Sequence, residues 1–250
     1  MTPGFEEFVG LRNYVELTRD YALPTAIRNN LIYVVGTTAG QMALGLLLAI
    51  MLDTKTIRGK VIFRTLLFFP TLLIPVSIGL IWKFMYDPVI GVINSFLTIL
   101  GFRTRFAWLD NTVTVMPSII LVGIWIGTGF NMIVYYAALQ NISPDLYDAA
   151  KVDGAGWWAT LRNVTVPSLS PVTTLLATWN IIGGFKVFDI IWVMTQGNPY
   201  HQSDVLSTWL YFNAFYMMKM GYASTIAVFT SAIVIVTSVI FLKLRMKQAY

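Results

Sequence analysis

The chain has 250 residues, of which 56% are hydrophobic and only 12% are charged, and its mean hydropathy is +0.68. A soluble domain carries about 25% charged residues, so this composition indicates an all-α integral membrane protein. The chain has no cysteine and a single histidine, which excludes disulfides and thiol nucleophiles and leaves metal sites and cofactors without support. The net charge of +5 comes from short basic clusters beside apolar runs. This pattern is typical of membrane orientation and argues against nucleic-acid binding.

Residues 1–29 are predicted to form an external segment that precedes the membrane domain. Four apolar residues have the spacing of an amphipathic surface helix, and Pro24 is expected to help end it. These apolar residues are Phe8, Leu11, Val15 and Leu17.

Residues 30–250 are predicted to form a transmembrane domain. A hydrocarbon core about 30 Å thick needs about 20 apolar residues of helix, and five stretches qualify. They are approximately 30–52, 66–85, 113–139, 172–194 and 222–242.

Basic residues gather in three of the polar segments: connector 53–64, loop 140–167 and the C-terminal tail. By the positive-inside rule these segments face the cytoplasm. The basic residues are Lys55, Arg58, Lys60, Arg64, Lys151, Arg162, Lys243, Arg245 and Lys247. Connectors 86–112 and 196–221 would then face outward, with aromatic residues suited to the membrane interface: Trp108, Tyr200, Trp209, Tyr211 and Tyr216.

Five spans with a cytoplasmic C-terminus place residues 1–28 outside. This segment has no apolar signal-peptide core of its own. We therefore expect a sixth, N-terminal helix to be missing from this sequence; the alternative is that the short polar N-terminus crosses the membrane unaided.

The polar loop between the third and fourth spans has the pattern of two short helices. Pro144 suits a first helical position after Ser143, a possible cap. Gly154 permits a turn into a second helix over 156–164, and Pro167 is expected to help stop that helix. A compact two-helix knob and a plain solvated connector both fit this pattern.

Two motifs lie at a fixed distance from each other in this loop: Asp148, Ala149, Ala150, Asp153, Gly154 and Ala155, followed by Val164, Thr165, Val166 and Pro167. They resemble the EAA loop in the permease subunits of bacterial ABC importers, which reads Glu-Ala-Ala, three residues, Gly, nine residues, then Ile-x-Leu-Pro. Three positions differ, with Asp148 in place of Glu and two valines in place of Ile and Leu. Charge and apolarity are kept, although Asp148 is one methylene shorter than Glu.

The resemblance implies that loop 146–167 is a coupling helix, which sits in a groove of an ATPase subunit and transmits ATP-driven closure to the membrane helices. It also implies the ABC type I importer permease fold in a bacterial plasma (inner) membrane. The implied partners are two ATPase subunits, a second permease subunit and an external substrate-binding protein. The chain has no Walker A loop, so ATP hydrolysis is expected in the separate ATPase subunits.

Two further segments resemble carbohydrate permeases of the maltose-transporter type. FVGLRNY at 8–14 is similar to the FxGLxNY segment before the second helix of those proteins. FKVFD at 185–189 and TQGNP at 195–199 are similar to a stretch that usually ends Thr-x-Gly-Gly-Pro, with Asn198 replacing one glycine. The resemblance runs from about residue 8 to the C-terminus and implies a sugar or related polyol as substrate.

Polar groups at membrane depth are candidate substrate contacts, because they are costly to bury unless they are paired or line a wet cavity. Aromatic faces and amides usually hold sugars, which favours Asn131, Trp179, Asn180 and Phe185. Gln41, Lys186 and Asp189 are further candidates. Lys186 and Asp189 are three residues apart, so they could instead pair with each other on one helix face. The aromatic residues could instead serve packing or interface anchoring.

Two other function classes compete with this reading. A membrane-embedded enzyme would need a nucleophile with its base or a metal cluster, and HExxH, GxSxG and CxxC are all absent from the sequence. We therefore expect neither catalytic nor metal-binding residues. An ion-coupled secondary transporter or channel fits the composition, but it does not explain the polar two-helix loop, and it predicts ion-driven flux without an ATPase.

Overall fold

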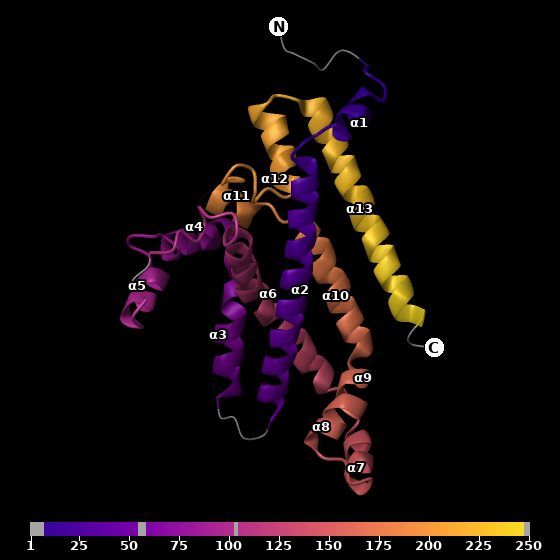
Figure 1. Ribbon diagram of the computed structural model, residues 1–250. Coiled ribbons are helices and arrows are strands. Elements are labelled where there is room, and N and C mark those ends of the chain that lie inside the picture. The colour runs from indigo at the N-terminus through magenta and orange to yellow at the C-terminus, as the bar shows by residue number, and fades with distance from the viewer. Residues whose placement is uncertain (1–7, 55–58, 103–104, 248–250) are drawn as a thin grey trace.

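The computed structural model describes residues 8–54, 59–102 and 105–247, and within these ranges the ordered elements are all helices (Figure 1). Lys55 and Arg58 lie outside the described residues, as does the side chain of Lys247. Three helices are long and apolar enough to cross a membrane alone: α2 (Leu23–Asp53), α6 (Val115–Leu139) and α13 (Met220–Lys247). Two more spans are bent pairs: α3 (Lys60–Leu72) with α4 (Pro75–Met85), and α10 (Ser170–Phe185) with α11 (Asp189–Thr195). With each bent pair counted as one span, these helices lie where the five spans were predicted.

Most of the shorter elements gather toward the two ends of the bundle (Figure 1). At one end lie α7 (Pro144–Val152), α8 (Trp157–Thr160), the π-helical turn η1 (Leu161–Thr165) and α9 (Val166–Ser168). Toward the other end lie α1 (Arg12–Leu17), α12 (Leu206–Tyr211) and the π-helical turn η2 (Phe212–Tyr216), while α5 (Val92–Ile99) lies at the side of the bundle beyond α4.

The predicted span 66–85 is not one straight helix. Between α3 and α4 the axis turns by 97°. Pro75 has no backbone N–H and disfavours a helical conformation at Ile74, which is extended with ψ at 127°. As a result α4 runs across the bundle and not along it (Figure 1). The predicted span 172–194 is also broken, by 43° between α10 and α11.

Helices α2 and α6 pack closely, and glycines set their separation. A Cβ atom at Gly123 would lie 2.9 Å from Cγ2 of Thr37, and one at Gly45 would lie 2.7 Å from Cβ of Asn131. Atoms of real side chains do not approach this closely, so these positions need glycine. Small residues that let backbones approach are a main source of helix association in membranes.

Two apolar clusters hold α4, α11 and the start of α10 on α6. Ile78 of α4, Ile119 of α6 and Ile191 of α11 are buried together. Nearer the end that carries α7, Leu139 of α6 packs with Leu169, which immediately precedes α10. The α4–α11 pair and the start of α10 are therefore fixed at opposite ends of the same helix.

The N-terminal segment differs from the prediction in two ways. Helix α1 has only six residues, and of the four apolar residues assigned to it only Leu17 is buried. Pro24 does not end this helix. It lies in the first turn of α2, where a missing N–H removes no intrahelical bond, so α2 begins at Leu23, earlier than the predicted span.

Asp20 ties this segment to the C-terminal part of the chain. Its carboxylate accepts hydrogen bonds from the backbone N–H of Ala22 (2.8 Å) and Leu23 (3.2 Å), from Nε1 of Trp209 (2.7 Å) and from the hydroxyl of Tyr222. Trp209 is buried, so it is a core residue and not the interfacial aromatic that the sequence suggested.

The loop between α11 and α12 folds around a buried carboxylate, Asp204. Oγ1 of Thr208 donates to it at 2.7 Å, and Nδ1 of His201 lies 2.7 Å from its other oxygen. Burial raises the pKa of Asp204 against the lowering effect of these two partners. Asn29 of α2 donates to the backbone oxygens of Gln202 (2.7 Å) and Asp204 (2.9 Å), which fixes the loop on α2.

Gly129→Ala is expected to destabilise the packing of α3 on α6. The new Cβ would overlap the carbonyl oxygen of Leu67 and lie 2.8 Å from Cα of Phe68, and neither backbone atom can rotate away. Overpacking of this kind costs about 1–3 kcal/mol, so the solubilised protein should melt at a lower temperature than wild type. Gly183→Ala is the matched control, because a Cβ there meets no heavy atom within 4 Å. Equal melting temperatures for the two variants would contradict this account of the packing.

Candidate functional site

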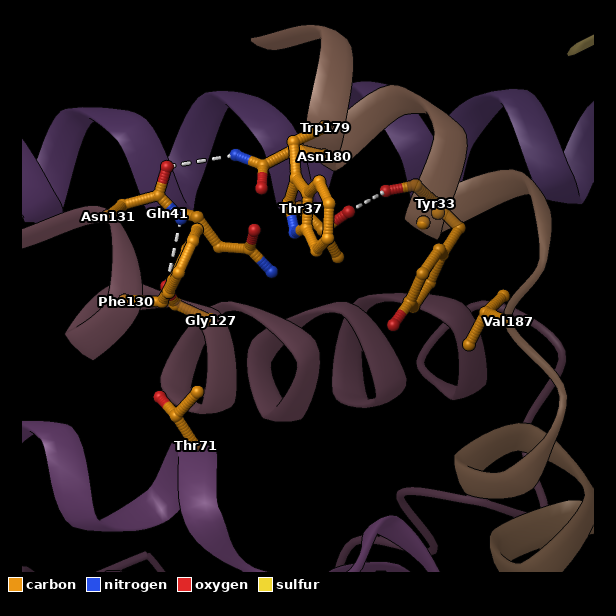
Figure 2. Close-up of a pocket in the computed structure, with 12 residues that line it drawn as sticks. Tyr33, Thr37, Gln41, Thr71, Gly127, Phe130, Asn131, Trp179, Asn180 and Val187 are labelled. Atoms are coloured by element: carbon orange, nitrogen blue, oxygen red, sulfur yellow. Dashed lines mark hydrogen bonds between the residues drawn. The ribbon is translucent and has the colours of Figure 1, made fainter. Parts of the chain in front are cut away.

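A cavity of about 330 Å³ opens between α2, α6 and α10, halfway along α2 (Figure 2). Helix α3 contributes one residue, Thr71. The polar lining consists of Thr37, Gln41, Thr71, Asn131 and Asn180, and the aromatic lining of Tyr33, Phe130 and Trp179. None of the described residues that line this cavity carries a charge.

An amide pair joins α10 to α6 at the cavity wall. Nδ2 of Asn180 donates to Oδ1 of Asn131 at 3.0 Å, and Nδ2 of Asn131 donates to the carbonyl oxygen of Gly127 at 2.9 Å (Figure 2). Both amides are buried, and buried amides are stable at membrane depth only with such partners. The pair therefore fixes the position of α10 on α6.

The other polar side chains use their donors on backbone carbonyls. Nε2 of Gln41 donates to Gly123 at 2.9 Å, the hydroxyl of Thr37 to Tyr33 at 2.7 Å, and that of Thr71 to Ile126 at 2.8 Å. A hydroxyl oxygen and an amide oxygen keep lone pairs after the donors are used. Each amide nitrogen also keeps a second N–H, so the cavity offers both donors and acceptors, which suit the hydroxyl groups of a ligand.

Trp179 gives the cavity an apolar face. It is 65% exposed, and its ring centroid lies 6.1 Å from that of Phe130 at an interplanar angle of 32°. A large, rigid and exposed ring beside amides is a surface on which the C–H face of a ring-shaped ligand can pack.

The structure brings four of the candidate substrate contacts together and places three elsewhere. Gln41, Asn131, Trp179 and Asn180 line the cavity. Phe185 is only 2% exposed and lies in the protein interior, while Lys186 and Asp189 are exposed at the break between α10 and α11.

The predicted pairing of Lys186 with Asp189 does not occur. Lys186 follows the last residue of α10, and Asp189 is the first residue of α11. Because the helix is broken between the two residues, their spacing of three does not place both side chains on one helix face. The ion pairs among the described residues are Lys151–Asp148, His201–Asp204 and Lys219–Glu16.

Sequence reasoning missed Tyr33, Thr37, Thr71 and Phe130 as lining residues. One signal was available: Tyr33, Thr37 and Gln41 follow each other at intervals of four, which places them on one face of α2. Thr71 and Phe130 had no such signal, because only the packing of α3 against α6 turns them toward the same space.

The loop 140–167 begins as the sequence predicts. The backbone N–H of Asp145 donates to Oγ of Ser143 at 3.3 Å, Pro144 is the first residue of α7, and Gly154 has a φ of +73°. Nζ of Lys151 lies 2.7 Å from the carboxylate of Asp148. Both side chains are largely exposed, and such surface pairs contribute little to stability.

The predicted end of the second helix is wrong. Pro167 does not stop the second helix, because η1, α9 and α10 follow α8 and carry the helical run to Phe185. At η1 the N–H of Val166 bonds the carbonyl of Leu161, five residues back, so the hydrogen-bond register shifts just before the proline. Asp153 does not cap the second helix, which begins after Gly156 without a side-chain cap.

One contact links the two halves of the loop. The hydroxyls of Tyr147 in α7 and Thr165 in η1 lie 3.4 Å apart, within hydrogen-bond distance. Helix α7 is therefore attached to the helical run from α8 to α10, which also carries Trp179 and Asn180 at the cavity.

A double-mutant cycle with Asn131→Ala and Asn180→Ala should give a favourable coupling of about 0.6–1.7 kcal/mol, the range for hydrogen bonds between membrane helices. Reversible unfolding of the protein in mixed micelles measures it. Asn180→Ala with Gln41→Ala is the control cycle, since Gln41 bonds Gly123 and not Asn180. Coupling in the control equal to that of the amide pair would contradict the interaction shown in Figure 2.

Three comparisons with known proteins bear on this site and fold. Residues 41–246 match the family described as binding-protein-dependent transport system inner membrane component. The chain is 36% identical over 238 residues to the probable ABC transporter permease protein YurN of Bacillus subtilis (strain 168). That alignment covers 94% of this chain and 82% of YurN. The chain is 35% identical over 244 residues to the arabinooligosaccharides transport system permease protein AraP of the same organism, covering 97% of this chain and 77% of AraP. A chain in the crystal structure of a bacterial alginate ABC transporter, in complex with alginate pentasaccharide-bound periplasmic protein, is similar with a TM-score of 0.86 and 26% identity, over 95% of this chain and 83% of that chain.

Proposed function

The chain belongs to the family of binding-protein-dependent transport system inner membrane components, and from this membership we propose that its central cavity is part of the pathway of a sugar or related polyol. Membership makes it a permease subunit of an ABC transporter and sets aside the alternative of an ion-coupled transporter or channel.

The lining of the cavity is the observation that carries the choice of substrate. Sugar hydroxyls can donate to the free oxygen lone pairs of Gln41, Thr37 and Thr71, while the C–H face of the ring packs on Trp179. The uncharged lining disfavours a glycerol phosphate, which would call for a cationic group. A relative that transports arabinooligosaccharides and a related structure that transports alginate support the same class of substrate.

We assign the coupling role to residues 146–167 of the loop. Near Gly154 the loop exposes apolar side chains: Val152 is 89% exposed, and Trp157 and Trp158 are also exposed. Exposed apolar surface at the tip of a polar loop suits a groove on another protein. We expect an ATPase subunit to bind there, so that this end of the bundle faces the cytoplasm.

The remaining partners follow from the same assembly. A second permease subunit completes the pathway, two ATPase subunits hydrolyse ATP, and an external substrate-binding protein delivers the sugar at the opposite end. Residues 1–29 then form an external segment, and residues 30–250 form the permease domain with its cytoplasmic loop. The periplasmic protein bound in the alginate transporter supports delivery of this kind.

Gly154→Pro should abolish binding of the ATPase subunit and leave membrane insertion intact. Proline cannot adopt the φ of +73° found at Gly154, and it removes the N–H that bonds the carbonyl of Lys151 at 3.0 Å. Co-purification of the ATPase subunit from mild detergent measures the effect. Asp153→Lys should weaken binding less, because the φ of −72° at Asp153 suits lysine and the turn at Gly154 is kept.

Gly156→Ala is the matched control for Gly154→Pro. Its φ of −70° suits any residue, and a Cβ there meets no heavy atom within 4 Å. The ATPase subunit should be recovered with this variant as with wild type. Normal uptake by the Gly154→Pro transporter would overturn the coupling role of the loop.

Trp179→Ala should raise the KM for uptake about tenfold or more without reducing assembly. The substitution removes the aromatic face of the cavity, and burial of a large apolar side chain is worth roughly 1.5–3 kcal/mol. Uptake of labelled sugar by reconstituted transporter measures the change. Leu175→Ala is the control, since Leu175 is similarly exposed one turn earlier on α10 and does not line the cavity. Equal effects of both substitutions would place the sugar elsewhere.

A further inference from the structure

A second cavity, of about 390 Å³, lies between α3 and α6 toward the end of the bundle that carries α7. We propose that it binds an anionic phospholipid, with the phosphate at Arg64 and the acyl chain along the apolar part of the cavity. The lining residues that carry this proposal are Arg64, Phe69, Leu72, Ile133, Tyr136 and Gln140.

This cavity is separate from the candidate substrate cavity. On α6 the substrate cavity uses Gly127, Phe130 and Asn131, whereas the second cavity uses Ile133, Tyr136 and Gln140 among others. At 3.6 residues per turn, the α6 residues that line one cavity point on average about 120° away, around the α6 axis, from those that line the other. Helix α3 also lies at the edge of the bundle in Figure 1. The second cavity therefore opens on another face of α6.

The polar end of the cavity is built for an anion. Cζ of Arg64 lies 5.2 Å from the ring centroid of Tyr136, so the ring holds the guanidinium in place. Arg64 belongs to none of the ion pairs between described residues. Its planar set of N–H donors matches the oxygens of a phosphate, and Thr65 and Gln140 add polar groups beside it.

The opposite end of the cavity is built for hydrocarbon. Phe69 is 54% and Leu72 68% exposed. They follow Arg64 on α3 by one to two helical turns, which places them roughly 8–12 Å from it along the axis, toward the middle of the span. An acyl chain attached to a phosphate at Arg64 would cover both side chains, whereas inorganic phosphate or a sugar phosphate has no group for this surface.

The neighbouring charges favour an anionic lipid over a neutral one. Lys60 lies one turn before Arg64 on α3, so both cations are on the same side of the helix. Nζ of Lys60 reaches the backbone oxygen of Asp53 at 3.4 Å, which keeps it near the start of α3. Basic pockets between helices at the membrane surface recognise lipid phosphates in this way.

Fluorescence quenching by brominated lipids tests the proposal in the complete transporter. The chain has no cysteine, so Leu72→Cys carries the fluorophore at the apolar part of the cavity, and transporter without this cysteine gives the background. In nanodiscs, brominated phosphatidylglycerol should quench at about a tenfold lower mole fraction than brominated phosphatidylcholine. Arg64→Gln should abolish this preference, and Arg64→Lys should retain part of it.

Lys83→Gln is the matched control, because it removes an exposed cation from the far end of the α3–α4 pair and should leave the preference unchanged. Equal quenching by the two lipids in the Leu72→Cys protein that keeps Arg64 would overturn the proposal. Absence of quenching by either lipid would also overturn it, since a protein subunit would then cover the cavity. Release of the brominated lipid by soluble glycerol phosphate would assign the site to a free phosphate instead.

Discussion

The close approach of α2 and α6 is the constraint on which the rest of the structure depends. At five levels a glycine on one helix faces a side chain on the other, and at three of them that side chain is polar: Gly45 faces Asn131, Gly123 faces Thr37, and Gly127 faces Gln41. Because each side chain occupies the space that the glycine leaves, the backbones approach and the polar groups are held between the helices. The polar wall of the cavity is thus a consequence of how these two helices pack.

The two broken spans support each other. Irregular backbone at membrane depth is tolerated only where protein or a water-filled cavity covers it. Helices α4 and α11, which follow the two breaks, pack together, with Gly79 against the side chain of Val193, and both bury isoleucines on α6. The two helices that follow the breaks therefore hold each other in place on α6.

The helical run from α8 to α10 connects the two functional regions. It starts beside the exposed tip of the loop, passes the π-helical turn, and reaches the cavity at Trp179 and Asn180. The hydroxyl contact of Tyr147 with Thr165 attaches α7 near its start, and the amide pair of Asn180 with Asn131 attaches its far end to α6. A displacement of the loop would therefore be transmitted to the cavity along one helical run.

The sequence by itself determined the features that depend on neighbouring residues alone. Hydropathy located the five spans, and the cap at Ser143 and the turn at Gly154 follow from local hydrogen bonding and backbone sterics. Gln41, Asn131 and Asn180 were identifiable because an amide within an apolar span needs a partner or a cavity.

Only the tertiary structure decided where those helices bend and which side chains share a space. Pro24 and Pro167 were expected to end helices, yet the first opens α2 and the second follows a π-helical turn that shifts the hydrogen-bond register. The break at residues 186–188 separates Lys186 from Asp189, and packing turns Thr71 and Phe130 into the cavity. The physical reason is that hydropathy and capping act along the chain, whereas bends and cavities depend on contacts between helices that lie far apart in sequence.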